Sequence, residues 1–410
     1  MKFVVFNLGC KVNQYECDVL CEKLTEKGYA VSENLEYADF YILNTCAVTS
    51  EAERKSRQAI ARCKNYNSNA KIIVCGCASQ NEPKNFIKDG VCYIMGTVDK
   101  INIINHIEDN EFNINIKEFP KEYEEITLNR STRTRAFIKI QDGCNNFCSY
   151  CLIPYLRGRS RSRKPENIIA EIKRLSSSSN EIVITGIDLM SYGKDIGTNL
   201  KYIFDCLKDI NVRIRLGSIY AEKITEDLLD SLFTLKNFCP HFHLSLQNGD
   251  DSVLKAMNRH YTTDDYLKKI NLIRKYNKNA SITTDIIVGY PTETNQNFIN
   301  SCEFLNEAKF SDLHIFPFSV RSGTRAALLK PIEPEIITSR KKILNEVKSN
   351  LKREFLTNNL NMHHEILFEE IKDGYCVGYS QNYIKIYTKQ YGTLINTVPT
   401  KIYRDGLMEE

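Results

Sequence analysis

Three closely spaced cysteines carry the clearest chemical signal in this 410-residue chain. Cys144, Cys148 and Cys151 form a Cys-x3-Cys-x2-Cys pattern in a polar stretch, directly after the apolar run Phe137–Ile140. A structural zinc site usually takes four ligands from paired cysteines, and no second pair lies nearby. Three thiolates instead suit a cubane iron–sulfur cluster that keeps one iron open for an external ligand. The spacing therefore favours an iron–sulfur cluster over zinc.

A second set of cysteines is spread over the first part of the chain. Cys10, Cys46 and Cys77 each follow a short apolar run, and these runs alternate with helical patterns. Such alternation predicts a parallel sheet, in which the ends of all strands meet at one edge. The three cysteines can therefore converge. Cys75 is expected on the same side of its strand as Cys77, so spacing does not choose between them, and three small buried residues are the alternative interpretation.

The apolar runs and helical patterns around both sets of cysteines predict an α/β protein in several parts. Residues 1–107 are expected to form an open parallel α/β domain, and the polar residues 108–131 a linker. Residues 132–345 hold six apolar runs that start 28 to 45 residues apart, which is typical of βα units and of a partial (β/α)6 barrel of the TIM type. Residues 346–410 switch to short strands, which predicts a small antiparallel β-barrel.

Composition narrows the class of protein. The 55 Lys and Arg nearly balance the 51 Asp and Glu, and no apolar run approaches the roughly 18 residues of a spanning helix. The N-terminus is interrupted too early for a signal peptide, and 15 cysteines without one do not indicate a disulfide framework. We expect a soluble, cytoplasmic protein without a membrane partner.

Several motifs resemble those of one family along nearly the whole chain. The Cys144–Cys151 pattern, with Tyr150 before its last cysteine, looks like that of the radical S-adenosylmethionine (SAM) superfamily. Together with Asn7–Glu16, Asn44–Thr49 and Gly76–Gln80, it resembles the methylthiotransferases. The resemblance implies an N-terminal methylthiotransferase domain, a radical SAM barrel and a C-terminal TRAM domain.

The same resemblance implies the cofactors. The family's Gly-Cys-x-x-Gln setting selects Cys77, and two [4Fe-4S] clusters are implied. Their proposed ligands are Cys144, Cys148 and Cys151 for one, and Cys10, Cys46 and Cys77 for the other. In that family one SAM supplies a 5′-deoxyadenosyl radical and another methylates a sulfur. No side chain is assigned as catalytic, because the clusters and SAM carry the chemistry.

The residues Lys11–Glu16 most resemble the tRNA threonylcarbamoyladenosine methylthiotransferases. The implied reaction replaces the C2 hydrogen of the modified adenosine 3′ to the anticodon with a methylthio group. The implied partners are tRNA, an electron donor of the flavodoxin or ferredoxin type, and a sulfur source. The alternatives are the same chemistry on isopentenyladenosine tRNA or on a ribosomal protein, and a non-catalytic iron–sulfur or zinc RNA-binding protein.

SAM is expected near the C-terminal ends of the barrel strands, where chemistry collects in βα barrels. The expected contacts are Tyr150, Gly186, Ser245, Gln247, Asp285 and Phe316. Tyr220 and Asn248 depart from the family's usual residues, which puts individual contacts of that region in doubt.

A basic segment follows the cluster loop. Alternate arginines in an extended segment would share one face suited to phosphates, and a solvated loop is the alternative. The arginines are Arg157, Arg159, Arg161 and Arg163. In the C-terminal part, Lys385 stands among tyrosines, as in single-strand binders, and the TRAM resemblance makes this part an expected tRNA-binding module.

Overall fold

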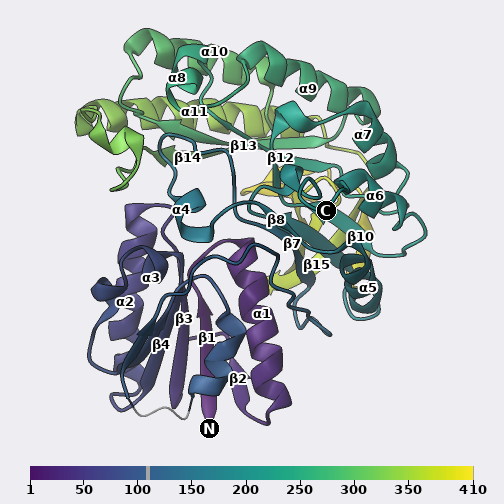
Figure 1. The fold of residues 1–410 in the computed structure, drawn as a ribbon. Coiled ribbons are helices and arrows are strands. Elements are labelled where there is room, and N and C mark those ends of the chain that lie inside the picture. The colour runs from purple at the N-terminus through teal and green to yellow at the C-terminus, as the bar shows by residue number, and fades with distance from the viewer. Residues whose placement is uncertain (108–110, 410) are drawn as a thin grey trace.

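The computed structural model describes residues 1–107 and 111–409 of the chain. The α/β class is confirmed: parallel sheets with helices form the first two parts, and a β-sheet forms the third (Figure 1). Residues 108–110 of the expected linker lie outside the described residues. No helix in the described part of the chain is long and apolar enough to cross a membrane.

The N-terminal part is a six-stranded parallel sheet with the order β2-β1-β3-β4-β5-β6. Its strands are β1 (Lys2–Asn7), β2 (Ala30–Ser32), β3 (Phe40–Thr45), β4 (Lys71–Gly76), β5 (Val91–Met95) and β6 (Asn113–Asn115). Its helices are α1 (Lys11–Glu26), α2 (Ser50–Tyr66) and α3 (Cys77–Asn81). The strand β6 falls within the expected linker and pairs with β5, so that segment extends the sheet.

The central part holds the six expected strands as a partial barrel of two sheets, ordered β10-β9-β7-β8 and β11-β12-β13-β14. Its strands are β7 (Arg135–Asp142), β8 (Arg161–Ser162), β9 (Glu181–Gly186), β10 (Arg213–Leu216), β11 (Ser218–Ile219), β12 (His241–Gln247), β13 (Ser281–Val288) and β14 (Asp312–Pro317). Gly217 separates β10 from β11, so one expected strand forms the end of both sheets. The short β8 is antiparallel to β7.

Helices cover the outside of this barrel (Figure 1). They are α5 (Pro165–Leu175), α6 (Leu200–Asp205), α7 (Glu226–Phe233), α8 (Asp251–Ala256), α9 (Thr263–Tyr276), α10 (Asn295–Ala308) and α11 (Pro334–Thr357). The short α4 (Ile153–Arg157) lies instead between the barrel and the N-terminal part (Figure 1). Local sequence sets where they begin: α9 and α10 each start with a capping box, formed by Thr262 with Asp265 and by Thr294 with Asn297. The barrel core combines aliphatic and aromatic side chains, with Ile138 and Phe242 among its fully buried residues.

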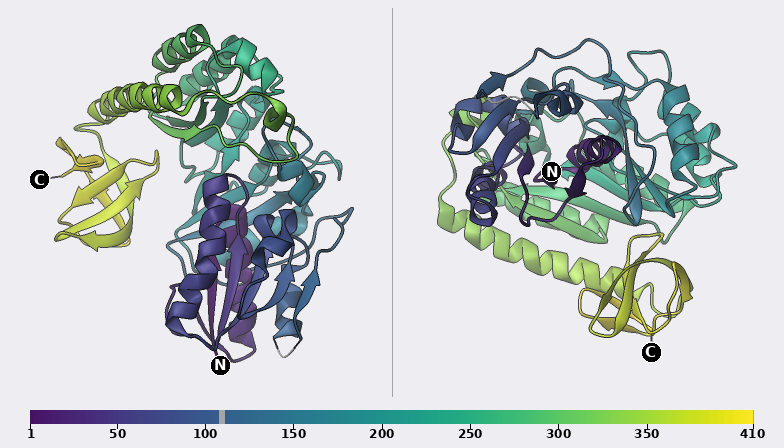
Figure 2. Two further views of the ribbon diagram at one scale, coloured as in Figure 1. Left: turned by 90° about the vertical axis from the view of Figure 1, so that its left-hand side faces the viewer. Right: turned by 90° about the horizontal axis from the view of Figure 1, so that it is seen from below.

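The C-terminal part is a six-stranded sheet that lies beyond the end of α11 (Figure 2). Its strands are β15 (His364–Lys372), β16 (Tyr375–Ser380), β17 (Lys385–Thr388), β18 (Leu394–Thr397), β19 (Lys401–Tyr403) and β20 (Gly406–Met408). All pairs are antiparallel except β17 with β20. The expected strand Leu394–Tyr403 is divided in two around Pro399, which has no N–H to donate.

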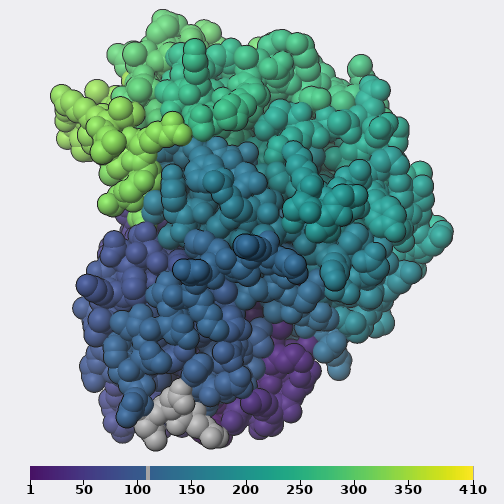
Figure 3. Space-filling view, in the orientation of Figure 1, coloured from purple at the N-terminus to yellow at the C-terminus, as the bar shows by residue number. Residues whose placement is uncertain are grey.

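The N-terminal part and the barrel are in continuous contact (Figure 3). Tyr15 of α1 donates its hydroxyl hydrogen to the Ile126 carbonyl oxygen at 2.9 Å, and Leu128 is buried in the barrel core. The helix α11 runs without interruption across the expected boundary between residues 345 and 346. These contacts bring the C-terminal edges of two parallel sheets close to each other.

Candidate active site

The first cysteine triad lies in one loop at the C-terminal end of β7. Gly143 begins this loop with a φ of +72°, and a Cβ on it would lie 2.0 Å from the carbonyl oxygen of Arg159. The turn therefore requires glycine. The thiols of Cys144, Cys148 and Cys151 lie close enough to perturb one another: burial, and then the neighbouring Cys148 charge, raises the pKa of Cys151 to about 12.

Each sulfur of this triad has a hydrogen-bond donor. Cys144 Sγ accepts from Asn146 Nδ2 at 3.3 Å, and Cys151 Sγ accepts from the backbone N–H two residues further on at 3.4 Å. Cys148 Sγ accepts from the Arg259 guanidinium at 3.5 Å. Donors of this kind stabilise thiolates and tune iron–sulfur clusters. Three thiols with such donors fit an iron–sulfur cluster with one iron left open.

Arg259 is a functional candidate that sequence reasoning missed. It is 7% exposed, and its guanidinium lies 4.5 Å from the centre of the Tyr220 ring. It also donates to the Ser245 carbonyl oxygen at 2.9 Å. A buried cation in contact with Cys148 offsets the negative charge of thiolates in this loop. No motif pointed to Arg259, because it comes more than a hundred residues after Cys148 in the chain.

The second triad lies at one edge of the N-terminal sheet. Cys10 is the N-cap of α1, Cys46 directly follows β3, and Cys77 is the first residue of α3. The strands β1, β3 and β4 are parallel neighbours, so their ends meet as the alternation predicts. Burial, with the Cys77 and Cys10 charges, raises the pKa of Cys46 to about 12. Three converging thiols fit a second cluster by the same donor chemistry.

Cys75 packs on the other face of this sheet, which corrects the expectation that it shares a side with Cys77. Cys75 belongs to the core between the sheet and α1, whereas Cys77 belongs to the core on the α2 side. Gly76 between them has a φ of +106°, and a Cβ there would lie 2.5 Å from the Thr45 carbonyl oxygen. This left-handed turn breaks the alternation of the strand and sends Cys77 to the opposite face.

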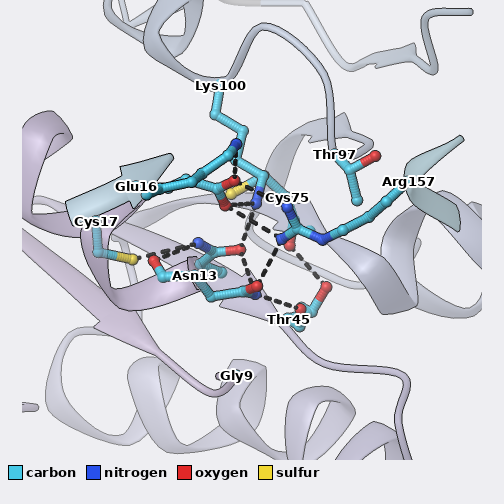
Figure 4. A network of polar contacts seen from close by, with 12 residues as sticks. Gly9, Asn13, Glu16, Cys17, Thr45, Cys75, Thr97, Lys100 and Arg157 are labelled. Carbon is cyan, nitrogen blue, oxygen red and sulfur yellow. Dashed lines mark hydrogen bonds and ion pairs between the residues drawn. The ribbon is translucent and has the colours of Figure 1, made fainter. Parts of the chain in front are cut away.

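A buried network of polar contacts connects α4, which follows the loop of the first triad, to α1, which follows Cys10 (Figure 4). Arg157 ends α4, six residues after Cys151, and its side chain is fully buried. Its guanidinium donates to Asn13 Oδ1 at 2.6 Å and to Glu16 Oε1 at 2.9 Å, on the helix that starts after Cys10. A single arginine therefore ties the first cysteine loop to the first turns of α1.

The same network balances its own charges. Glu16 also accepts from Lys100 at 2.6 Å and from Lys139 at 2.9 Å, and Lys139 pairs with Asp142 at 2.7 Å. Burial raises the pKa of Glu16, but Arg157, Lys100 and Lys139 outweigh it and lower that pKa well below its ordinary value. The carboxylates of Glu16 and Asp142 are therefore both ionised at neutral pH, as buried ion pairs with Arg157, Lys100 and Lys139 require.

A cavity of about 600 Å³ lies inside the barrel, between the first residues of α1 and the C-terminal sheet. Cys10, Lys11 and Val12 form one part of its wall. Its barrel wall includes Thr185, Gly186, Ser218, His243, Thr283, Asp285 and His314. The Lys11 side chain is exposed to the solvent of the cavity. The surrounding protein atoms still desolvate its ammonium group, and this, together with the Arg215 charge, lowers the pKa of Lys11.

Two histidines flank a carboxylate inside this cavity. Asp285 carboxylate oxygens lie 3.2 Å from His243 Nε2 and 3.2 Å from His314 Nδ1. Burial raises the pKa of Asp285, but the hydrogen bonds of the two imidazoles outweigh it and lower that pKa. The three side chains have the spacing of a possible metal site, and without a metal they offer donors and acceptors to a polar ligand.

Four of the residues predicted to contact SAM lie around the barrel mouth. Gly186 and Asp285 line the cavity. Tyr150 lies near Cys148, and burial, followed by the Cys148 charge, raises the pKa of Tyr150. The carbonyl oxygen of Ser245 accepts a hydrogen bond from Arg259. Their contact with SAM stays a prediction.

The other two predicted SAM contacts differ in exposure. Gln247 ends β12 with a φ of +75°, and Phe316 on β14 is 42% exposed. Of the two departures from the family pattern, Asn248 donates to Glu293 Oε2 at 3.0 Å, and Tyr220 stacks with Arg259. Both substituted side chains are thus held by defined local contacts.

The predicted phosphate-binding row of arginines is wrong at three of its four positions. Arg157, Arg161 and Arg163 are 1%, 4% and 0% exposed. Arg163 pairs with Glu171 at 2.5 Å, and Arg161 lies 4.0 Å from Asp142. The segment does not keep one conformation: Arg157 ends a helix and Arg161 starts β8, so the four side chains do not share one exposed face, and these three turn inward towards acidic neighbours.

The remaining basic candidates have different surroundings. Arg159 is exposed, with its guanidinium 4.5 Å from the centre of the Phe147 ring. Lys385 is half-buried, lines the cavity and pairs with Asp405 at 3.2 Å. RNA contact stays a prediction for both residues.

Two family models match the chain. The model of the Radical SAM superfamily matches residues 138–305, and that of the Uncharacterized protein family UPF0004 matches residues 2–96. The first range contains the triad of the barrel loop, and the second contains the triad of the N-terminal sheet.

Curated relatives match over nearly the full length. The threonylcarbamoyladenosine tRNA methylthiotransferase MtaB of Bacillus subtilis is 35% identical over 99% of this chain and 95% of its own. The protein of that name from Thermotoga maritima is 36% identical over 92% and 89%. A tRNA-2-methylthio-N(6)-dimethylallyladenosine synthase of Clostridium botulinum is 34% identical over 85% and 82%.

A solved structure shares the fold at low identity. The radical SAM methyltransferase TsrM from Kitasatospora setae aligns with a TM-score of 0.55 and 12% identity, over 77% of this chain and 72% of that one. Such a likeness concerns the fold alone. The full-length relatives carry the assignment, and the two cysteine triads agree with it. The chain belongs to the MtaB-type methylthiotransferases of the radical SAM superfamily.

Proposed function

We propose that this enzyme transfers a methylthio group to C2 of N6-threonylcarbamoyladenosine, next to the anticodon of tRNA. The proposed cofactors are SAM and two [4Fe-4S] clusters. Their ligands are Cys144, Cys148 and Cys151 for the radical cluster, and Cys10, Cys46 and Cys77 for the second. We assign residues 1–107 to the domain of the second cluster, 132–345 to the radical SAM domain, and 346–410 to a TRAM domain that binds tRNA.

The observation that carries this proposal is the approach of the two triads from two separate sheets. Leu152 and Leu156, which directly follow the first triad, pack in the same buried cluster as Cys77. Thr97 donates its hydroxyl hydrogen to the Leu156 carbonyl oxygen at 2.7 Å, and Arg157 reaches Asn13 on the other side. These contacts hold the loop of the first triad against the N-terminal part, whose sheet edge carries the second triad.

This class of reaction needs a radical source and a sulfur donor. An aryl C–H bond has no acidic proton, so a general base cannot start the reaction. When bound, SAM and the clusters supply the radical that removes the C2 hydrogen and the methylated sulfur that replaces it. The protein's own residues hold the geometry: Arg259 and Asn146 donate to the sulfurs of the radical cluster, and Arg157 fixes its loop against α1. An electron donor of the flavodoxin or ferredoxin type and a sulfur source complete the proposed reaction.

Two measurements test this function. Nucleoside mass spectrometry of tRNA from a deletion strain should show N6-threonylcarbamoyladenosine without its methylthio derivative. Loss of the methylthio group from isopentenyladenosine instead would overturn the substrate assignment. Anaerobic reconstitution should give about eight irons per chain and reductive SAM cleavage, as two four-iron clusters require. An iron-free zinc protein that binds RNA would overturn the enzymatic assignment for these sites.

A further inference from the structure

One cation on the cavity wall differs from the others in its pairing with carboxylates. Five Lys or Arg side chains line the cavity. Four of them pair with carboxylates, as Arg135–Glu181 (2.9 Å), Arg215–Glu181 (2.6 Å), Lys352–Asp312 (3.0 Å) and Lys385–Asp405 (3.2 Å). Lys11 has no hydrogen-bond or ion-pair partner among the residues that the structure describes. The cavity therefore holds one lysine whose charge is free to meet a ligand.

The acidic group facing Lys11 in the cavity is already engaged. Asp285 accepts from His243 and His314, each at 3.2 Å, and forms no hydrogen bond or ion pair with Lys11, although its charge acts on the lysine from a distance. The positive end of the α1 helix dipole lies at the same wall, because Cys10, Lys11 and Val12 are consecutive and all line the cavity. This part of the wall therefore favours an anion.

Lys11 lies close to the place where C2 of the substrate adenine would react. Cys10, a proposed ligand of the second cluster, is its neighbour in the chain and lines the same cavity. A purine carbon that receives sulfur there must lie close to Cys10. In adenine, C2 and C6 flank the same nitrogen, N1, so a substituent on N6 extends along the ring edge beside C2. A lysine next to Cys10 is thus placed to reach the end of that substituent.

We propose that Lys11 binds the carboxylate of the threonyl group on N6 and thereby selects threonylcarbamoyladenosine over adenosines with an apolar N6 group. This rests on the function proposed above. Thr185 and Ser218 line the same cavity, and their hydroxyls offer partners to the hydroxyl and urea groups of the substituent. An apolar dimethylallyl group would instead leave the Lys11 charge without a partner, which is unfavourable.

The test pairs a protein change with a matching substrate change. The probes are an anticodon stem–loop RNA with threonylcarbamoyladenosine and the same RNA with the threonyl carboxylate as its methyl ester. The reconstituted wild-type enzyme should bind the free acid about tenfold or more tighter than the ester, as expected for a charge-assisted contact. Lys11→Met should bind both RNAs with equal affinity, and Lys11→Arg should restore part of the preference. Lys352→Met, a change of another cavity lysine, should keep the wild-type ratio.

The outcomes separate this inference from the proposed function. Equal iron content and melting temperature of Lys11→Met and wild type establish that the variant folds and holds its clusters. If wild type methylthiolates the threonylcarbamoyl RNA but Lys11→Met keeps the acid-over-ester ratio, Lys11 does not read the carboxylate and the inference fails alone. If wild type methylthiolates only RNA with isopentenyladenosine, the proposed function fails and the inference fails with it.

Discussion

The two cysteine triads of this enzyme are built in opposite ways. One lies within the eight residues 144–151, in a single loop after one strand. The other takes one cysteine from each of three βα units, spread over residues 10–77. The first needs only the local turn at Gly143, whereas the second needs a sheet with the strand order β1-β3-β4. A metal site can thus be set by local backbone geometry or by sheet topology.

The difference extends to what holds each triad. The barrel triad receives hydrogen bonds from its own loop and from Arg259. The second triad depends on Gly76 to turn Cys77 towards the shared edge, and α1 is fixed to the barrel through Glu16 and Arg157. The dispersed triad is therefore the one that should respond to changes in domain packing.

Removing one ligand from each triad should have the most distinct effects. Cys144→Ala should abolish reductive SAM cleavage, because the radical cluster loses a ligand. Cys46→Ala should keep SAM cleavage but block thiolation of tRNA, because only the second cluster is affected. Production of 5′-deoxyadenosine and of methylthiolated nucleoside measures both. Equal loss of cleavage in both variants would contradict this division of labour.

The choice between Cys75 and Cys77 can be tested by iron content. Cys77→Ala should lower the iron of the reconstituted protein from about eight to about four per chain, because the second cluster loses a ligand. Cys75→Ala removes only a small side chain from the core on the α1 side and should retain about eight. Iron analysis with electron paramagnetic resonance of the reduced protein reports both clusters. Four irons in the Cys75 variant and eight in the Cys77 variant would reverse the assignment.

Breaking the buried network should destabilise the junction of the two parts. Arg157→Met removes one of the three cations that pair with Glu16 and one of those that pair with Asp142, and the loss of hydrogen bonds to charged groups in a buried site costs about 1.5–3 kcal/mol. Equilibrium urea unfolding measures the free energy. Arg159→Met, on an exposed side chain two residues away, is the matched control and should change it by less than about 0.5 kcal/mol. Similar values for both variants would show that the network does not stabilise the junction.

Acid should weaken the same network by a smaller amount. Burial raises the pKa of Asp142, but Lys139 and Arg157 outweigh it and hold that pKa at about 2, below the ordinary 3.8. The folded state therefore favours the carboxylate, so its contribution is complete above about pH 4 and is lost as the pH falls towards 2. The difference in unfolding free energy between wild type and Asp142→Asn should narrow between about pH 4 and pH 2. A constant difference over this range would exclude Asp142 as the titrating group.

Local patterns in the sequence were sufficient to predict the first cysteine triad and most strands of the N-terminal sheet and the barrel. The Cys144–Cys151 spacing needs no tertiary information, and the apolar runs located every strand that carries a cysteine of either triad. The arginine row failed for a physical reason. Alternation along a segment predicts a shared face only if the whole segment is extended, and here Arg157 ends a helix before β8 begins at Arg161. Glu16 and Glu171, the acidic partners of Arg157 and Arg163, come from other elements, which no local pattern contains.

The sequence by itself determined the α/β class, the two sets of three thiols and the family resemblance, because these depend on residue spacing and strand periodicity. Only the tertiary structure decided which face Cys75 occupies, because the left-handed turn at Gly76 overrides alternation. Only the tertiary structure placed Arg259 beside Cys148 and left Lys11 without a carboxylate in a cavity where other cations are paired. Ion pairing in a buried site depends on distances between distant parts of the chain, and those distances are set when the sheets pack together.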